Sequence, residues 1–416
     1  MTTISPNSHV YTLLTMLCYV GEYPLRSLHL LGSKEVWRKL ILKHSQSQEY
    51  RISNNSNRTT CRLLIVTGKG KNKSVRISKA GLDLFQQVNP EAVDYFTNNY
   101  FRHNHAGEAN RIDRFHRVAE AVAMIQLAGF ETCPFTLPIL QMYSIDKVVP
   151  DEPSFYISKE LKYFGSDNIN KISFSRITGA LFYPGGCYAV YNSRDYLMVW
   201  RGHGESKVRD HLTKVARMNA EIDGVDSAIL FGSDYQIADV TLQSLSDYQK
   251  VENRFDSIYD CLHFIPLDSF GVRLLKILTI PDWKEKLLDI LFDPEDLAVD
   301  TGNFEYDAFE EGRYVISFLD SDIIRLNRFA GSITGVEERS SVICFPEQAA
   351  FVRRLVGPKV EITTVTLEMV EETLNNEGSD ASERQKTKNR NHCCLDPRMR
   401  GNSLFGRTSG SSVHEL

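Results

Sequence analysis

The stretch from Ile65 to Gly81 carries the residue types that bind phosphate groups. Its sequence, IVTGKGKNKSVRISKAG, holds five Lys and Arg residues and three glycines. Such a segment could hold the phosphates of a nucleotide, or it could contact the backbone of a nucleic acid. The nucleotide-binding pattern GxxxxGK[ST] is absent, and no long helical pattern begins directly after the glycines. The stretch therefore favours contact with a nucleic acid.

A second group, Asp195, Glu205 and Lys207, has the side chains of a metal-dependent nuclease. Two carboxylates can hold Mg²⁺, and the metal activates water against a phosphodiester. Asp195 falls in a predicted turn, however, and Glu205 is expected to cap the helix that follows. We therefore expect surface charges at loop and helix ends and no catalytic residue, with a nuclease kept as an alternative.

Two further sets have metal-ligating side chains: His103, His105 and His116, and Asp293, Glu295 and Asp296. The histidines do not match a tight zinc spacing, and the acids do not match a Ca²⁺ loop. Gly232-Ser233-Asp234 follows a predicted buried strand, where α/β sheets often bind ligands, but it lacks the glycine fingerprint of a nucleotide site. We expect no metal ion and no cofactor.

Three helices and a hairpin are predicted in the first ninety residues. Apolar side chains at helical spacing predict helices at the start of HVYTLLTMLCYVGEYP, in PLRSLHLLG and in SKEVWRKLILKHSQSQ. The extended runs TCRLLIVTG and KSVRISKAG, joined by KGKN, predict a hairpin with a basic tip. This order predicts a winged helix-turn-helix, whose third helix can enter the major groove of DNA while the hairpin tip contacts the backbone.

Double-stranded DNA is therefore the predicted partner. Arg38, His44 and Gln46 of the third helix have groups that can read bases, and the lysines of the hairpin tip can neutralise phosphates. The predicted DNA-binding residues are Lys34, Arg38, Lys43, His44, Gln46, Lys69, Lys71, Lys73 and Arg76. A second basic set could extend the contact, namely Arg102, Arg111, Arg114 and Arg117. Because winged-helix readers often bind two half-sites, a homodimer is possible.

The middle of the chain predicts the order helix, three strands, helix, strand. The first helix is RIDRFHRVAEAVAMIQLAGF, the strands are KISFSRITGALFY, CYAVYN and YLMVW, and ESKVRDHLTKVARMNAEI and DSAILFGSD complete the order. This αβββαβ order resembles the core of restriction endonucleases, which carry two acids and a lysine on the second and third strands. CYAVYN and YLMVW contain no carboxylate, so we expect a degenerate core.

Strand-then-helix patterns repeat after His263 and predict further α/β units. The predicted fold class is α/β with an N-terminal winged helix-turn-helix. The expected domains are residues 1–90, a nuclease-like domain at 91–275, and a C-terminal α/β region at 276–374. The polar residues 375–416 are expected to be a disordered tail, because they have few apolar side chains to bury.

The net charge of -5 is unevenly distributed. Residues 1–90 hold 13 Lys and Arg against 4 Asp and Glu, a balance of +9, whereas the remaining residues hold 35 against 49, a balance of -14. A basic end on an acidic body is expected when that end alone meets a polyanion. No run is long enough to span a membrane and no signal peptide is recognisable. The eight cysteines lie mostly in apolar runs, which suits reduced thiols in a cytoplasmic protein.

The order of these features resembles the replication-relaxation family of plasmids and integrative conjugative elements. The resemblance covers roughly residues 8–270 and is carried by LLTMLCYVGEYPLRSLHLLG, VWRKLILKH, RISKAG, RFHRVAEAVAMIQLAGF, SRITGALFYPGGCYAVYNSRDYLMVW and ESKVRDHLTKV. It implies a winged-helix DNA-binding protein fused to a nuclease-like domain, acting in plasmid replication, relaxation or conjugative transfer. A relaxase or another transfer or replication protein is an implied partner.

The expected function is therefore a DNA-binding accessory protein of a mobile genetic element. Two alternatives stay open, a Mg²⁺-dependent nicking enzyme and a protein-interaction adaptor whose winged helix does not meet DNA.

Overall fold

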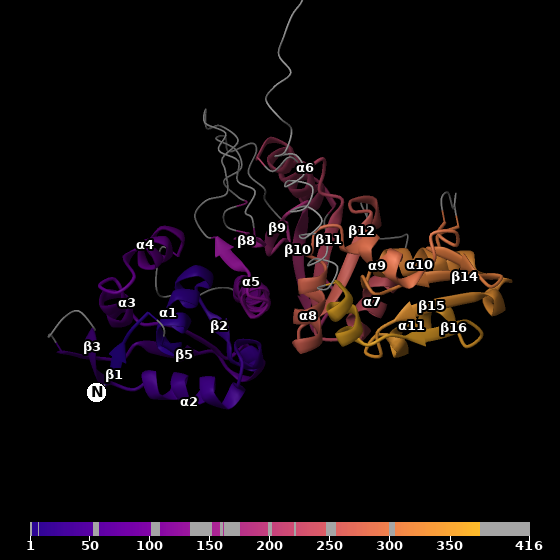
Figure 1. The fold of residues 1–416 in the computed structure, drawn as a ribbon. Coiled ribbons are helices and arrows are strands. Elements are labelled where there is room, and N and C mark those ends of the chain that lie inside the picture. The colour runs from indigo at the N-terminus through magenta and orange to yellow at the C-terminus, as the bar shows by residue number, and fades with distance from the viewer. Residues whose placement is uncertain are drawn as a thin grey trace, which may run out of the picture. The chain divides into compact units, whose positions relative to one another are not determined.

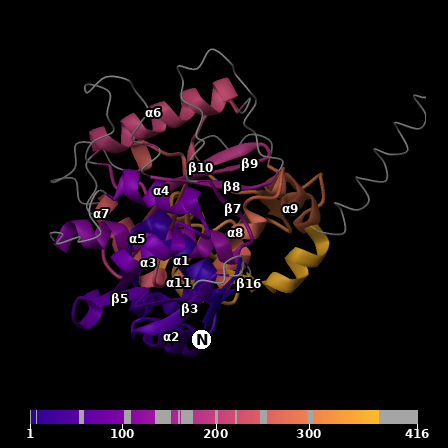
Figure 2. The same ribbon diagram turned by 90° about the vertical axis from the view of Figure 1, so that its left-hand side faces the viewer.

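The chain is described here by a computed structural model (Figures 1 and 2). The described residues are 2–6, 8–52, 58–100, 109–133, 152–158, 161, 175–198, 202–219, 222–246, 255–298 and 304–374. Residues 1–367 form one compact unit, and a second unit covers 368–416. The predicted tail at 375–416 lies outside the described residues. The domain boundaries expected near residues 90 and 275 stay predictions. No helix in the described ranges is long and apolar enough to cross a membrane.

Three helical segments open the chain. Ser8 caps α1 (His9–Val20), because its Oγ accepts the Tyr11 N–H, and Gly21 ends the helix with a φ of 82°. A 3₁₀ segment, η1 (Leu25–Leu31), follows and is kinked at Ser27. The third is α2 (Lys34–His44). The three predicted helices are thus present, although the second is 3₁₀ and the third is shorter than expected.

Two small sheets accompany these helices. In the first, β2 (Tyr23–Pro24) and β5 (Leu64–Thr67) both pair antiparallel with β6 (Ser74–Ile77). The β5–β6 pair confirms the predicted hairpin. The second sheet was not predicted and has the order β1 (Thr2–Ile4), β3 (Gln48–Ile52), β4 (Arg58–Cys61). The run TCRLLIVTG is therefore not one strand, because its start belongs to β4 and its end to β5.

Three more helices lead to the main sheet: α3 (Lys79–Phe85), α4 (Pro90–Asn99) and α5 (Ala109–Leu127). Helix α5 was predicted, and its segment from Val118 to Ile125 is buried on every side. It packs against α1, β2 and η1 and also against β7, β8 and β10. A helix that is buried all round needs apolar or paired side chains on each face. Helix α5 is therefore shared between the N-terminal elements and the main sheet.

The main sheet has six strands in the order β12-β11-β10-β9-β8-β7. Their bounds are β7 (Glu131–Cys133), β8 (Ser154–Ile157), β9 (Gly179–Tyr183), β10 (Gly186–Arg194), β11 (Ser227–Gly232) and β12 (Cys261–Pro266). Strands β8, β9 and β10 pair antiparallel, whereas β10, β11 and β12 are parallel. Parallel neighbours need crossover helices, which here are α6 (Gly202–Asn219) and α7 (Tyr235–Ser246).

The strand prediction for this sheet was partly wrong. The segment YLMVW is not a strand at residues 196–198, and residues 199–200 lie outside the described ranges. The strand before α6 is β10, which continues through the polar residues YNSR to Arg194. Strands β7 and β8 were not predicted. Two of the three predicted strands are present as β9 and β10, and the described elements from α5 to β11 follow the order α5, β7, β8, β9, β10, α6, β11.

The C-terminal region confirms the repeated strand–helix plan. Helices α8 (Ser269–Ile277) and α9 (Trp283–Leu291) follow β12. A second sheet has the order β13 (Ala308–Glu310), β14 (Arg313–Ser317), β15 (Ser340–Cys344), β16 (Glu361–Thr364), and its last three strands are parallel. Its crossover helices are α10 (Ile323–Ser332) and α11 (Ala349–Val356), and residues 367–374 are helical.

One buried core joins the two larger sheets. It includes Leu230 and Phe264 of the six-stranded sheet together with Ile316 and Val342 of the four-stranded sheet. A bridge between His263 and Asp322 links β12 to the loop before α10. The cysteines described with side chains are free thiols, and those that are buried are Cys18, Cys61, Cys187 and Cys344.

Candidate nucleic-acid interface

The tip of the β5–β6 hairpin presents three exposed lysines, Lys69, Lys71 and Lys73. The tip is a short 3₁₀ turn, η2 (Gly70–Asn72), closed by bonds from Asn72 N–H to the Lys69 carbonyl (3.1 Å) and from Lys73 N–H to the Gly70 carbonyl (3.3 Å). These bonds hold the lysines at defined positions on the turn. The tip is therefore an ordered cationic turn that can approach a phosphate backbone.

Two glycines make this turn possible. Gly68 has a φ of 78° and Gly70 a φ of 55°, a region that side-chain-bearing residues rarely adopt. A Cβ at Gly68 would lie 2.2 Å from the carbonyl oxygen of Asn72, whereas a Cβ at Gly70 would meet no atom within 4 Å. Gly68 is thus required for close approach across the turn, and Gly70 only for its backbone angle.

Helix α2 is buried on one narrow face and exposed on the rest. The buried residues are Trp37, Ile41 and His44. The indole N–H of Trp37 donates to the Leu31 carbonyl at 2.6 Å and fixes α2 against η1. Figures 1 and 2 show α2 at the margin of the N-terminal elements, with no helix or strand on its outer side. Its exposed polar and charged residues are Lys34, Glu35, Arg38, Lys39 and Lys43, and Gln46 is exposed just beyond its C-terminal end.

The prediction that His44 reads bases is wrong. Its side chain is only 3% exposed. The ring stacks on Tyr50 of β3, and its Nδ1 lies 2.8 Å from the Tyr50 hydroxyl. Burial, with the nearby charge of Lys43, lowers the pKa of His44 to about 4. His44 therefore joins α2 to β3 and does not lie on the outer face.

Arg76, on β6, is half-buried, and its Nε has no hydrogen-bond partner among the described residues. It is thus less accessible than the tip lysines. Sequence reasoning missed Lys39 and Leu42, which are both exposed. The spacing of the buried residues 37, 41 and 44 marks the opposite face, so the outermost line of α2 is 35, 39 and 42.

The exposed cations of α2 and the hairpin tip make no ion pair with any other described residue. In the described parts of 2–100, Arg26 pairs with Asp195, Arg58 pairs with Glu49, and Glu22 pairs with His116. An intramolecular carboxylate would compete with phosphate for the same lysine or arginine. The positive charge of this surface is therefore available to an external polyanion.

The candidate catalytic residues occupy three different environments. Asp195 makes two hydrogen bonds with Arg26, at 2.9 and 3.2 Å. Burial alone would raise the pKa of Asp195, but Arg26 outweighs it and holds the pKa below its usual value. Lys207 is exposed on α6. No contact joins either residue to Glu205 within the described ranges.

Glu205 is fully buried. Its carboxylate accepts hydrogen bonds from Ser175 Oγ (2.9 Å), the Arg176 N–H (2.7 Å) and the Tyr191 hydroxyl (3.0 Å). Burial raises its pKa, although these bonds partly offset the effect. The expectation that Glu205 is a surface charge is wrong, and its position is equally unsuited to an accessible Mg²⁺ site. No group of three metal-ligating side chains occurs in the part of the chain that the structure describes.

Two members of the second basic set, Arg114 and Arg117, are partly or fully buried and so are less accessible than the cations of α2 and the hairpin tip. Arg117 is buried, donates to Asp113 and to the Asn192 carbonyl, and its guanidinium carbon lies 4.7 Å from the centre of the Tyr196 ring. Arg114 is half-buried, and burial lowers its pKa. His116 is buried with Glu22, at 2.8 Å, instead of lying on the helix surface. His103, His105, Arg102 and the side chain of Arg111 lie outside the described residues.

A buried ionic network is centred on Glu120 of α5. Arg194 donates to its carboxylate from Nε and Nη2, at 2.9 Å each. Asn192 donates at 3.2 Å, and Ser27 of η1 donates at 2.5 Å. Arg194 ends β10 with a φ of 62°, where the pairing with β11 shifts register. The network connects η1, α5 and β10 through a single carboxylate.

Two other predicted features are structural. Asp234 accepts the N–H of Gln236 at 2.9 Å and so caps α7, which explains the Gly232-Ser233-Asp234 turn. Asp293 and Glu295 are exposed, and Asp296 is half-buried.

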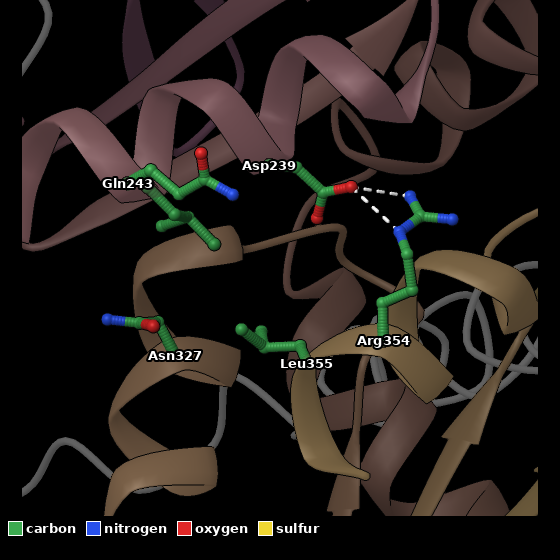
Figure 3. Close-up of a pocket in the computed structure, with 6 residues that line it drawn as sticks. Asp239, Gln243, Asn327, Arg354 and Leu355 are labelled. Atoms are coloured by element: carbon green, nitrogen blue, oxygen red, sulfur yellow. Dashed lines mark hydrogen bonds and ion pairs between the residues drawn. The ribbon is translucent and has the colours of Figure 1, made fainter.

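A surface pocket of about 440 Å³ lies between α7, α10 and α11. Figure 3 shows Asp239 of α7 pointing at Arg354 of α11, with Gln243, Asn327 and Leu355 around them. The two charged groups pair at 2.6 Å. Because they neutralise each other, this pocket offers no unpaired charge among its described lining residues to hold or activate a substrate.

No family model, no curated protein and no solved structure matches the chain. The class that the structure itself defines is a mixed α/β protein with several mixed sheets.

Proposed function

We propose that this chain is a double-stranded-DNA-binding accessory protein of a mobile genetic element. Its reader is a winged helix-turn-helix made of α1, η1, α2 and the β2–β6–β5 sheet. The order helix, strand, helix, helix, hairpin is the order of that motif, with the β3–β4 hairpin inserted after the third helix. In this arrangement α2 enters the major groove, and the β5–β6 tip is the wing that contacts phosphates.

The observation that supports this proposal most strongly is the exposed positive charge on α2 and the hairpin tip, which is unpaired among the described residues. Seven cations, on two elements that the motif brings to DNA together, are exposed and make no ion pair within the described residues: Lys34, Arg38, Lys39 and Lys43 on α2, and Lys69, Lys71 and Lys73 on the hairpin tip. The acidic balance of the rest of the chain limits contact with DNA to this end.

The proposal for the middle of the chain is a degenerate nuclease-like core. The strand before α6, β10, ends in Asn192, Ser193 and Arg194, where an active enzyme of this kind would carry a carboxylate. Arg194 is committed to Glu120 inside the protein. The similarity to the replication-relaxation family extends the proposal to plasmid replication, relaxation or transfer, with a relaxase or another transfer protein as partner.

The salt dependence of DNA binding tests the wing. If six phosphates are neutralised, affinity should fall about a thousandfold between ~50 and ~200 mM salt. Replacing Lys69, Lys71 and Lys73 together by alanine should reduce the slope of log affinity against log salt by about 2.7, because each phosphate contact contributes about 0.9. Fluorescence anisotropy with a labelled random-sequence duplex measures both slopes.

The matched control changes the charge equally at three exposed lysines elsewhere, Lys207, Lys214 and Lys276. This triple variant should keep the slope of the original protein. If the tip variant keeps the original slope of log affinity against log salt, the hairpin tip does not contact the DNA phosphates. Absence of binding at low salt would favour the adaptor alternative, and Mg²⁺-dependent nicking of supercoiled plasmid would favour the enzyme.

A further inference from the structure

Helix α2 exposes apolar side chains in the middle of its basic face. Leu42 is 56% exposed and Val36 is 47% exposed. They are the only exposed Val or Leu side chains in the described parts of residues 2–100. Val36, Lys39 and Leu42 follow at a spacing of three, so they are neighbours along one ridge of the helix. Along this ridge the cationic side chain of Lys39 therefore lies between the apolar side chains of Val36 and Leu42.

A ridge of this composition matches the major groove of a thymine-containing duplex. Phosphates line the edges of the groove, and thymine places a 5-methyl group inside it, which adenine, guanine and unmodified cytosine lack. Leu42 lies next to Lys39 on the outermost line of α2, where a groove-bound helix comes closest to base edges. Contact with a methyl group would remove its exposed apolar surface from water.

We propose that Leu42, assisted by Val36, contacts thymine methyl groups, so that the chain selects duplexes with thymine at the positions facing α2. This inference rests on the proposed function and names the chemistry by which α2 selects its sites. Gln46, exposed just beyond the C-terminal end of α2, carries an amide of the kind that can bond an adenine.

Charge argues against a second copy of the chain as the occupant of this face. Arg38, Lys39 and Lys43 surround the apolar positions, so two such faces would bring like charges together. A polyanion that also offers methyl groups satisfies both parts of the surface.

The test replaces thymine by uracil, which removes the methyl group and keeps the base-pairing groups. The full chain first enriches its preferred site from a pool of random 40-bp duplexes (about four helical turns), and that site is then synthesised with thymine or with uracil. The uracil duplex should bind about fourfold more weakly for each methyl group that Leu42 or Val36 touches in the thymine duplex. The double variant Val36→Ala, Leu42→Ala should bind both duplexes equally and should keep the original salt slope, because the phosphate contacts are unchanged.

The control variant is Val240→Ala, an exposed valine on α7 that should keep the preference for thymine. Equal binding of both duplexes by the original protein would overturn the inference and leave the proposed function standing. Failure to bind either duplex would reject the proposed function itself. If Leu42→Ala instead converts a dimer to a monomer in light scattering, with the thymine preference retained, the face is a contact between copies and the inference is wrong.

Discussion

At the scale of the residue, His44 shows how one side chain can change role between sequence and structure. Its position on a basic helix suggested an exposed group, but its ring is enclosed against Tyr50. A buried imidazole stays neutral because burial disfavours its charged form. His44 is therefore a pH-sensitive part of the fold and does not lie on the surface proposed to bind DNA.

This placement gives a pH prediction. The pKa of His44 is about 4 in the folded chain against 6.5 in the unfolded chain. Between these values the unfolded chain binds a proton that the folded chain does not, so the free energy of unfolding falls as the pH falls, by up to about 1.4 kcal/mol per pH unit. Above pH 6.5 the effect disappears. His44→Gln should lose this part of the pH dependence when thermal unfolding midpoints are compared at pH 7.5 and pH 5 (values chosen to lie on either side of the histidine pKa).

The same variant separates stability from recognition. At pH 7.5, where His44 is neutral in both states, His44→Gln should bind duplex DNA within about twofold of the original protein, since the side chain is away from the outer face of α2. A large loss of affinity with an unchanged unfolding midpoint would mean that His44 contributes directly to DNA binding.

At the scale of the element, the hairpin tip depends on two glycines in different ways. Gly68→Ala would place a Cβ against the Asn72 carbonyl, so the turn must shift and the three lysines move with it. Gly70→Ala has open space around it and costs only about 1 kcal/mol for the left-handed backbone. We expect Gly68→Ala to weaken DNA binding about tenfold in the anisotropy assay, while Gly70→Ala stays near the original affinity. Each phosphate contact that the shift breaks reduces binding at low salt.

Equal affinities for the two glycine variants would mean that the shape of the tip is unimportant. Unfolding midpoints of both variants should lie close to that of the original chain, because the tip is exposed and contributes little to the core.

The elements that sequence reasoning found are those defined by local patterns. The β5–β6 hairpin has alternating apolar residues and glycines at its turn, and the C-terminal strand–helix repeats have long apolar runs. Strands β3, β4 and β8 were missed because they are only four or five residues long, and because β3 and β8 also pair with strands distant in sequence, β1 and β9. The polar end of β10 was missed because Glu120 of α5 makes a buried arginine favourable there.

The sequence predicted the site correctly for charged side chains that are exposed. It failed for charged side chains that are buried because a residue of another element pairs with them. The tip lysines are exposed as their composition suggests. Arg117, His116 and Glu205 are instead buried with partners on other elements, which no periodicity reveals. Leu42 was missed for the opposite reason, because an apolar residue on a helix is expected to face the core.

At the scale of the whole molecule, the ionic network around Glu120 holds the N-terminal elements and the main sheet together. Glu120→Ala would leave the buried Arg194 without its carboxylate, which should cost about 3–5 kcal/mol. The control is Glu49→Ala, which breaks an exposed pair with Arg58 at 3.4 Å and should cost less than about 1 kcal/mol. Urea unfolding followed by circular dichroism compares the two variants. Similar midpoints for both would mean that the network adds little.

Helix α5 has a consequence for deletion mapping and for chimeras. A fragment cut at residue 90 would lack His116 and Glu120, the partners of Glu22 and Ser27, and would expose the surfaces that α5 covers. A fragment that starts after α5 would leave the buried Arg194 without the Glu120 carboxylate. Truncations on either side of α5 would thus misfold. A fragment that fails to bind DNA would therefore not identify which part of the chain binds it. Binding sites in this chain are better mapped by point substitutions on the surface, or by chimeras in which α5 is transferred together with the N-terminal elements.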